Sequence, residues 1–458
     1  MSPVSPSYRA APRISTLGDA FYDEVTPAQF PRRELCFRNQ RWAERIGLGS
    51  LDAREWEAHF ARFVPLPLNL PKPLALRYHG HQFDVYNPHL GDGRGFLFAQ
   101  VEDDTGRLLD LGTKGSGTTP WSRGGDGRLT LKGGVREVLA TEMLEALGVP
   151  TSRSLSLFET GEALMRGDEP SPTRSSVLVR LSHSHVRFGT FQRLARLGDE
   201  QRLERLVSYV AASYYPDLAP GPDLPQRLLS RVCRMTAELC AAYMAAGFVH
   251  GVLNSDNMSI TGESFDYGPY RFLPTYDLGF VAAYFDETGL YAYGEQPRAM
   301  LRNVLRLAEA LRALAPDVAL GGLAKEFEAT LEAGLARRFV RRLGLRSRPD
   351  TDWVLAERAM LFMNDSQVGF ERFFHDLYAA PLRAPRDAAP YAGPRWDALR
   401  EVLELYEAAV TAVPPYFAQQ VPCTLLIDEI ESIWTAIAER DDWAPFEAKV
   451  ERIRAIGA

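Results

Sequence analysis

Cysteine is scarce in this sequence. Only four occur in 458 residues, Cys36, Cys233, Cys240 and Cys423, and none belongs to a Cys-x-x-Cys pair. The sequence therefore lacks both the ligand spacing of a zinc site and the density of a disulfide framework. This composition is typical of a protein from a reducing compartment.

Long apolar runs and an excess of basic residues are also missing. No stretch approaches the roughly 18 apolar residues of a transmembrane helix, and residues 1–16 contain no apolar signal-peptide core. The 52 Lys and Arg residues are outnumbered by 59 Asp and Glu residues, which gives a net charge of -7. These absences predict a cytoplasmic, monomeric protein with no nucleic-acid or membrane partner.

What the sequence does contain changes in character along the chain. Residues 1–70 are predicted to be an N-terminal wrapping extension with short helices, and residues 71–194 alternate short apolar runs with glycine-rich turns. Residues 195–458 carry long stretches of helical periodicity. The pattern predicts an α+β, protein-kinase-like two-lobed fold, with a sheet-rich N-lobe over 71–194 and a larger helical C-lobe over 195–458.

Individual elements follow from the same patterns. Residues 95–101 and 108–114 are predicted to be paired strands, and residues 175–181 another strand. Residues 133–148 predict a helix that stops at Gly148, with Pro150 beyond. Further helices are predicted at 224–248, 298–315, 322–345, 398–410 and 426–440.

The segment HGVLNSDNMSITGESFDYGP, residues 250–269, is similar to the catalytic loop of a protein kinase, H-R-D-x-x-x-x-N followed by D-F-G. Asn257 takes the position of the metal-binding Asn, and Asp266 that of the metal-binding Asp. Val252 stands where the catalytic Asp is expected, and it cannot accept a proton. The segment indicates either an inactive kinase or one that performs different chemistry.

Two residues upstream complete a kinase-like set. Lys114 ends a predicted strand and Glu137 lies on the predicted helix that follows, so a strand-to-helix ion pair is expected. Taken alone, the two could equally be a surface lysine and a surface glutamate. The appearance of four kinase-like parts in the right order favours the ion pair.

Two glycine-rich turns accompany this set. The first, LGDGRG, contains Gly91, Gly93 and Arg94, and the second, GGDGR, contains Asp126 and Gly127. Glycines let backbone N–H groups approach phosphate oxygens, and arginines bind those oxygens with two parallel hydrogen bonds. Each segment could also be a plain hairpin turn, but the basic residues around both turns favour nucleotide binding.

Two arginines enter the region where a kinase binds adenine. Arg180 interrupts a predicted strand and Arg187 follows its end. A single arginine there could be a surface residue, whereas two indicate a pocket for negative charge. If phosphates lie there, the nucleotide is turned end for end.

Together these motifs resemble a known family. The strings YHGHQFDVYNPHLGDGRG, KGSGTTPWSRGGDGR, REVL, SHSHVRFGTF and the 250–269 segment are similar to those of the selenoprotein O family, over roughly residues 15–300. The resemblance implies a pseudokinase fold that binds ATP inverted with Mg²⁺ or Mn²⁺. It also implies transfer of AMP to Ser, Thr or Tyr hydroxyls of protein substrates, with release of pyrophosphate.

The resemblance also implies roles for individual residues. Asp256 is similar to the family's active-site base, and Asn257 and Asp266 to its metal ligands. The positions similar to its nucleotide-binding residues are Gly91, Gly93, Arg94, Lys114, Asp126, Gly127, Glu137, Arg180, Arg187 and Asp266.

The chain departs from the family at Asp84, where a glycine is usual, so the local backbone or nucleotide geometry is expected to differ. The C-terminal part also departs from the usual family sequence. Two alternatives to AMP transfer stay open at this point. One is transfer of UMP from UTP with Mn²⁺, and the other is a catalytically silent nucleotide-binding scaffold.

Overall fold

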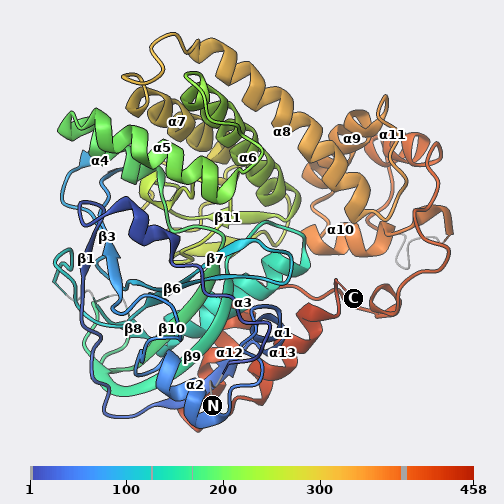
Figure 1. The fold of residues 1–458 in the computed structure, drawn as a ribbon. Helices are drawn as coiled ribbons and strands as arrows, with labels where there is room; N and C mark the ends of the chain where they lie inside the picture. Colours follow the sequence, from blue (N-terminus) through green and yellow to red (C-terminus); the bar gives the residue numbers. More distant parts are fainter. Residues whose placement is uncertain (1–3, 125–126, 168, 383–388, 458) are drawn as a thin grey trace.

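The structure, a computed structural model, describes residues 4–124, 127–167, 169–382 and 389–457. It is a mixed α/β protein in which a large antiparallel sheet occupies the N-terminal part and helices dominate after residue 188 (Figure 1). Within the described residues, no helix combines the length and the apolar character needed to cross a membrane.

The sheet takes strands from three separate parts of the first 182 residues. The predicted pairing of β6 with β7 is confirmed, as is the predicted strand β10, which lies beside β7. The extension over residues 1–70 supplies both edge strands. The order is β1 (Tyr22–Glu24), β3 (Leu74–Leu76), β6 (Leu97–Glu102), β7 (Leu108–Lys114), β10 (Thr173–Ser182), β9 (Arg153–Leu164) and β2 (Glu34–Arg38), with β8 (Leu129–Thr130) pairing to β10.

Helix α3 (Leu131–Ala146) confirms the helix predicted in this region. The Thr130 side chain caps its first turn by accepting a hydrogen bond from the Gly133 N–H. The helix ends before Gly148, whose φ of 74° is the left-handed conformation that glycine adopts without strain. Its apolar residues are buried against β9 and β10, which fixes the position of Glu137 beneath the sheet.

The helical part confirms the predicted long helices α6, α7 and α8, and adds helices that the sequence did not predict. The prediction that the helix near residue 398 continues to residue 410 is wrong, because α11 ends at Leu403. The chain beyond it leaves the helix to pair with the backbone of residues 344–346 instead. The helices are α4 (Phe188–Leu197), α5 (Glu200–Tyr214), α6 (Leu224–Ala245), α7 (Gln296–Ala310), α8 (Leu320–Arg342), α9 (Asp352–Ser366), α10 (Phe370–Leu377) and α11 (Pro394–Leu403).

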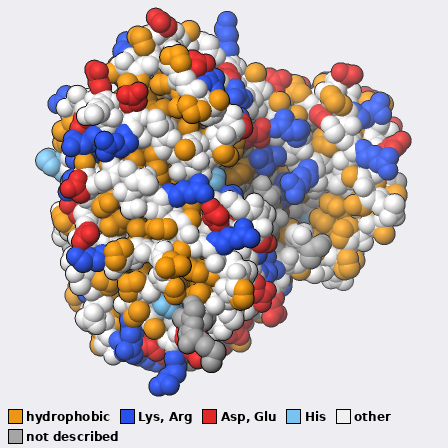
Figure 2. Space-filling view, viewed as in Figure 1, with side chains coloured by type: hydrophobic (Ala, Val, Ile, Leu, Met, Phe, Trp, Pro, Cys, Tyr) orange, Lys and Arg blue, Asp and Glu red, His pale blue; other side chains and the backbone are white. Residues whose placement is uncertain are grey.

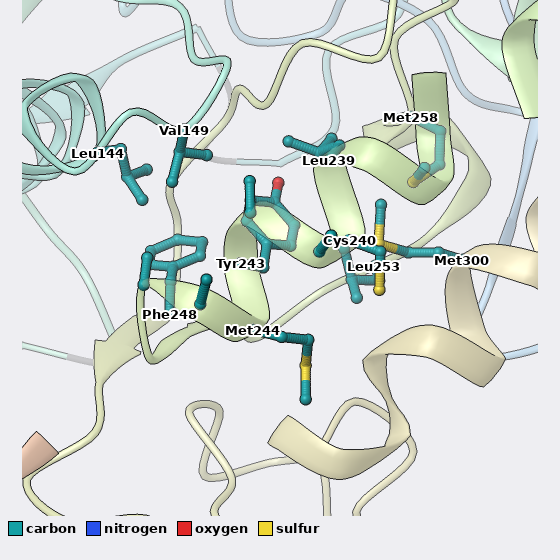
Figure 3. Packing of buried hydrophobic residues seen from close by; sticks show 14 of the residues in the cluster. Leu144, Val149, Leu239, Cys240, Tyr243, Met244, Phe248, Leu253, Met258 and Met300 are labelled. Atoms are coloured by element: carbon teal, nitrogen blue, oxygen red, sulfur yellow. The ribbon is translucent and has the colours of Figure 1, made fainter. Parts of the chain in front are cut away.

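One hydrophobic core runs through both parts. Tyr243 of α6 lies between Leu144 and Val149 from the sheet side and Met300 of α7 from the helical side (Figure 3). These residues belong to one continuous cluster of buried side chains. Such shared packing makes the sheet and the helices one mechanical unit.

The last two helices return to the sheet. Helices α12 (Ile427–Arg440) and α13 (Ala444–Arg454) pack against α3 (Figure 1), and Glu142 of α3 accepts hydrogen bonds from both Arg454 of α13 and Arg41 of the short helix α1 (Gln40–Arg45). Lys132 at the start of α3 pairs with Glu431 at 2.7 Å. Phe37 of β2 meets the ring of Phe446 edge-on, at 6.2 Å between centroids. The C-terminal helices therefore complete the outer face of α3.

Charged side chains of both signs are present on the face of the molecule shown in Figure 2. In the face shown by Figure 2, Lys and Arg side chains alternate with Asp and Glu over most of the area. Several Lys or Arg side chains lie beside the hollow that separates the region of α9–α11 from the rest. This interspersed pattern agrees with the small net charge of -7.

Glu142 is expected to be the polar residue of α3 on which the docking of α13 depends most. Its carboxylate is buried and accepts hydrogen bonds from Arg454 at 2.7 Å and 2.9 Å, from Asn39 at 3.1 Å and from Arg41 at 3.2 Å. Glu142→Ala leaves these donors without their shared acceptor. We expect it to lower the free energy of unfolding by about 1–3 kcal/mol.

The measurement is the unfolding midpoint in urea. The control is Glu451→Ala, which removes an exposed carboxylate from α13 itself and is expected to change the midpoint very little. Equal midpoints for the two variants would contradict the role assigned to Glu142.

Candidate active site

A cavity of about 560 Å³ opens between the sheet and the loops of the helical part. Most of the predicted site residues line it, from segments far apart in the sequence. They are Gly91, Gly93, Arg94, Lys114, Arg180, Arg187, Asp256, Asn257 and Asp266. The size is ordinary for a pocket that holds a small molecule.

Three other predicted positions stand apart from this lining. Glu137 reaches the site through its partner Lys114. Gly127 packs against the backbone of Gly117, which donates a hydrogen bond to the Gly127 carbonyl at 3.1 Å. Asp126 lies outside the described residues.

The ion pair predicted between Lys114 and Glu137 is present. Strand β7 delivers the lysine and α3 the glutamate, and both side chains are buried. The Lys114 ammonium also lies 2.7 Å from Oδ1 of Asp266. Lys114 therefore links the sheet, α3 and the DYGP segment at the floor of the cavity.

Asp266 is held by positive charge. Its Oδ1 lies 3.4 Å from the Arg180 guanidinium as well as beside Lys114. Although burial alone would raise the pKa of Asp266, the charges of Lys114, Arg180 and Arg187 hold that pKa well below its usual value. Its backbone has a φ of 67°, an uncommon conformation for a residue other than glycine. Asp266 is therefore an ionised carboxylate at all physiological pH values.

Arg187 connects the first glycine-rich turn to the predicted catalytic loop, residues 250–257. Its guanidinium donates to Asp92 Oδ1 at 3.1 Å and to the backbone carbonyl of Asp256 at 2.9 Å. The same group lies over the rings of Tyr78 at 4.5 Å and Phe265 at 4.8 Å. Arg187 thus sets the distance between the turn and the loop in addition to adding positive charge.

Asp256 lies in the short helical turn η2 (Ser255–Asn257), and only 8% of it is exposed. Burial raises its pKa to about 6, while the charge of Arg187 acts in the opposite direction. A carboxylate with such a pKa is a better proton acceptor than an exposed one, and it is still ionised at pH 7. The segment that lacks a carboxylate at Val252 therefore has a buried one four residues later.

Asn257 is oriented by its own loop. Its Nδ2 donates to the carbonyl of Val252 at 2.9 Å, which leaves Oδ1 as the atom available to a ligand. Among the residues that the structure describes, no three His, Cys, Asp or Glu side chains gather as a metal site. A divalent cation here would take few protein oxygens and complete its shell with phosphate and water, as Mg²⁺ commonly does.

Buried polar atoms without partners indicate that the site is built to hold something charged. Within the described part of the chain, Asp256 Oδ1, Glu137 Oε2 and the Nε atoms of Arg180 and Arg187 are buried and make no hydrogen bond. Unpaired groups of this kind are costly and rare in folded proteins. Two of the donors and one of the acceptors, on Arg180, Arg187 and Asp256, belong to residues that line the cavity, and they fit an anionic ligand that arrives with a metal cation.

A small hairpin supports the catalytic loop from the side of the sheet. It consists of β4 (Gly80–Gln82) and β5 (Val85–Asn87). The His81 N–H donates to Ser255 Oγ at 2.7 Å, and the Phe83 N–H donates to Asn254 Oδ1 at 3.1 Å. These bonds connect the hairpin to the residues directly before Asp256.

The turn of this hairpin contains Asp84, the residue that stands where the resembled family usually has glycine. Phe83 and Asp84 have φ values of 47° and 65°, so the aspartate adopts a conformation that glycine would adopt more easily. Its carboxylate pairs with Arg302 at 2.7 Å and with Arg306 at 2.6 Å, both on α7. The side chain therefore fastens the hairpin to the helical part, a contact that glycine could not provide.

Gly80→Ala is expected to slow catalysis while leaving nucleotide binding intact. A Cβ atom at position 80 would lie 3.0 Å from Asp256 Oδ1 and 3.3 Å from the Asp256 backbone nitrogen. The catalytic loop must shift by a few tenths of an ångström, and small displacements of reacting groups are expensive. We expect the rate of nucleotide transfer to fall on the order of tenfold.

The measurement compares kcat with the dissociation constant of ATP. Gly321→Ala is the matched control, because a Cβ at that position meets nothing within 4 Å. A Gly80→Ala enzyme with unchanged kcat would show that the hairpin does not constrain Asp256.

Several residues of the site carried no clear signal in the sequence. Asp92 is the partner of Arg187, and Trp121 covers Gly91, where any side chain would collide with the indole ring. Asp23 of the edge strand β1 accepts a hydrogen bond from Trp121 Nε1 at 2.9 Å. His185 of the SHSH segment lines the cavity. Asp92, Trp121 and His185 lie within the motif strings quoted from the sequence, where no specific role was assigned to them, whereas Asp23 lies outside every string.

Comparison with known proteins shows the family of the chain. A family model described as "Protein adenylyltransferase SelO" matches residues 6–454. A protein named "Protein nucleotidyltransferase YdiU" from Synechocystis sp. is 44% identical to this chain, and the match covers 97% of both chains. A protein of the same name from Gloeobacter violaceus is 45% identical to this chain, and the match covers 97% of this chain and 94% of the other. A protein of the same name from Vibrio parahaemolyticus is 34% identical over 91% of this chain and 82% of its own. Since the match extends over nearly the whole sequence, the chain belongs to the SelO family of protein nucleotidyltransferases.

Proposed function

We propose that this chain is a protein adenylyltransferase, which transfers AMP from ATP to Ser, Thr or Tyr hydroxyls of protein substrates and releases pyrophosphate. The proposal includes a protein-kinase-like arrangement of a sheet-rich lobe over residues 71–194 and a helical lobe over residues 195–458. The Lys114–Glu137 ion pair and the shared cavity of Asn257 and Asp266 support that arrangement.

The observation that carries the proposal is the buried positive charge on the sheet side of the cavity. Arg180 lies on strand β10 beside β7, both Arg180 and Lys114 are buried, and both contact Asp266. A neutral adenine ring gains little from such a wall, whereas phosphate oxygens gain charge-assisted hydrogen bonds. The triphosphate end of the nucleotide therefore points inward, and the α-phosphorus faces the catalytic loop.

Asp256 then acts on the acceptor hydroxyl. As the hydroxyl oxygen bonds to the α-phosphorus, its proton passes to the Asp256 carboxylate. The bond between the α-phosphorus and the bridging oxygen breaks, and its electron pair leaves with pyrophosphate. Lys114 and the two arginines stabilise the charge that develops on the phosphate oxygens.

Asn257 Oδ1 and the Asp266 carboxylate are the groups that would hold Mg²⁺ or Mn²⁺. The cation supplies further neutralisation of the phosphate charge when bound. The low pKa of Asp266 keeps this ligand ionised. The unpartnered Asp256 Oδ1 in the same cavity supports the fit.

The experiment uses ATP labelled at two positions. Incubation with α-³²P-ATP and a divalent cation is expected to label protein, whereas γ-³²P-ATP is expected to leave it unlabelled. Mass spectrometry should find AMP on a hydroxyl side chain. Label from the γ position alone would mean ordinary phosphorylation, and stronger label from α-³²P-UTP with Mn²⁺ would mean UMP transfer. Equal self-labelling by wild type and Asp266→Ala would favour the silent scaffold.

A further inference from the structure

Two neighbouring aromatic side chains are exposed at the mouth of the active site. Tyr284 is 85% exposed and Phe285 is 44% exposed. Throughout the described residues, every other Phe, Tyr and Trp side chain is at least partly buried. Both rings line the same cavity as Asp256 and Val252. Exposed aromatic surface is therefore concentrated at one place, beside the catalytic loop.

Residues near Asp256 contact this aromatic pair. The Phe285 ring packs on Phe83 of the hairpin turn at 5.9 Å, and Phe83 packs on Tyr291 at 5.2 Å. The Tyr291 hydroxyl donates to Asn254 Oδ1 at 2.7 Å, the same oxygen that accepts from the Phe83 N–H. Phe285 is thus connected to Asn254, two positions before Asp256, through its packing on Phe83 and the hydrogen bond from Phe83 to Asn254.

The turn that follows the pair is also fixed. Asp286 is 5% exposed, and its carboxylate accepts hydrogen bonds from the N–H groups of Leu290 at 2.9 Å and Tyr291 at 2.8 Å. The segment is therefore a closed turn with a buried anchor. An aromatic surface presented in a fixed position loses little conformational entropy when a partner binds.

Position and polarity indicate which ligand the pair would take. The cations that suit phosphate lie on the sheet side of the cavity, at Lys114, Arg180 and Arg187. Tyr284 and Phe285 are exposed to solvent, and they line the same cavity as the apolar side chains of Val252 and Ala282. An acceptor hydroxyl must enter from solvent to reach Asp256, so the polypeptide that carries it passes these rings.

We propose that Tyr284 and Phe285 form a docking surface for an apolar or aromatic side chain of the acceptor protein, close in sequence to the modified hydroxyl. This inference rests on the proposed transfer to protein hydroxyls and specifies the acceptor. Aromatic residues in such positions contribute much of the binding energy at protein interfaces. The pair therefore selects acceptor segments by the residues that flank the hydroxyl.

The test uses synthetic peptides with a single Tyr hydroxyl, flanked either by Leu and Phe or by Gly and Asp. With α-³²P-ATP, the wild-type protein is expected to modify the apolar peptides with a kcat/KM roughly tenfold higher. The variant Tyr284→Ser/Phe285→Ser is expected to lose this preference, while its KM for ATP stays within about twofold of wild type. Val421→Ser, at a 60% exposed apolar position outside the cavity lining, is the control and should retain the preference.

Two results would overturn the inference. One is a wild-type protein that shows no preference between the peptides. The other is a double variant that keeps the preference but has a raised KM for ATP, which would assign the rings to the nucleotide base. Thermal unfolding of each variant should match that of the wild type, because the replaced side chains are exposed.

Peptide binding, measured by fluorescence anisotropy without transfer, separates this inference from the proposed function. If no α-label reaches any peptide or the protein itself, the proposed transfer fails. Apolar peptides that then still bind the wild type at least tenfold more tightly than the double variant would keep the docking surface. Equal binding by both proteins would overturn it.

Discussion

Replacing Asp256 with asparagine is expected to reduce the rate of AMP transfer about a hundred- to ten-thousand-fold, the range typical for the loss of a general base. Asparagine has the same shape but does not accept a proton from the acceptor hydroxyl. The fold should be preserved, because Asp256 Oδ1 makes no hydrogen bond within the described part of the chain. The measurement is single-turnover labelling with α-³²P-ATP, together with the dissociation constant of ATP, which should change little.

The dependence of kcat/KM on pH gives an independent check on Asp256. Burial raises the pKa of this carboxyl to about 6, so the base becomes protonated and inactive as the pH falls below that value. The kcat/KM of the wild type should therefore decline on the acid side of about pH 6, since this quantity reports the free enzyme. The residual activity of Asp256→Asn should lack that decline. Asp317→Asn, at an exposed position on the loop after α7, should behave as wild type.

Lys114→Met is expected to lower both stability and activity. The lysine is buried between Glu137 and Asp266, and Glu137 is only 1% exposed. Removing the positive charge leaves a buried carboxylate without its partner, a change that commonly costs about 3–5 kcal/mol of folding free energy. The unfolding midpoint should fall accordingly, and AMP transfer should be lost with the phosphate contact.

A double variant separates the two effects. In Lys114→Met/Glu137→Leu the buried Glu137 charge has been removed along with Lys114, and Asp266 keeps its contact with Arg180, so the unfolding midpoint is expected to recover most of the loss. Transfer is expected to stay at the level of the single variant, since Lys114 would bind the phosphates directly. If the double variant regained AMP transfer together with stability, Lys114 would have only a structural role.

Regular elements were predictable wherever the periodicity was local. Helix α3 has apolar residues at helical spacing and a glycine stop signal, and β6 and β7 are short, largely buried runs with a turn between them. The hairpin of β4 and β5 was not predicted, because its turn consists of Phe83 and Asp84, and Phe is an unusual residue at a left-handed position, while Asp84 stands where such turns usually have glycine. The predicted length of α11 was wrong because residues 407–409, which lie beyond the observed end of the helix, pair with the distant backbone of residues 344–346.

The site was predictable as a set of motifs but not as a set of contacts. The order of Lys114, Glu137, Asn257 and Asp266 was enough to indicate phosphate chemistry. Their functional roles, and those of the arginines, remain predictions. The contact of Arg187 with Asp92, and the packing of Phe285 on Phe83, join residues about 95 and 200 positions apart. No local pattern encodes such pairs, because they depend on how the whole chain closes.

The return of the final helices to α3 has a consequence for the protein as the ribosome makes it. Residues 22–38 provide both edges of the large sheet and are synthesised well before residues 427–454, which cover α3. Phe446, Val450 and Ile453 are buried in the folded protein, so the surface that they cover stays open until these residues have been made. A nascent chain with such a persistent apolar surface is the kind of client that chaperones bind.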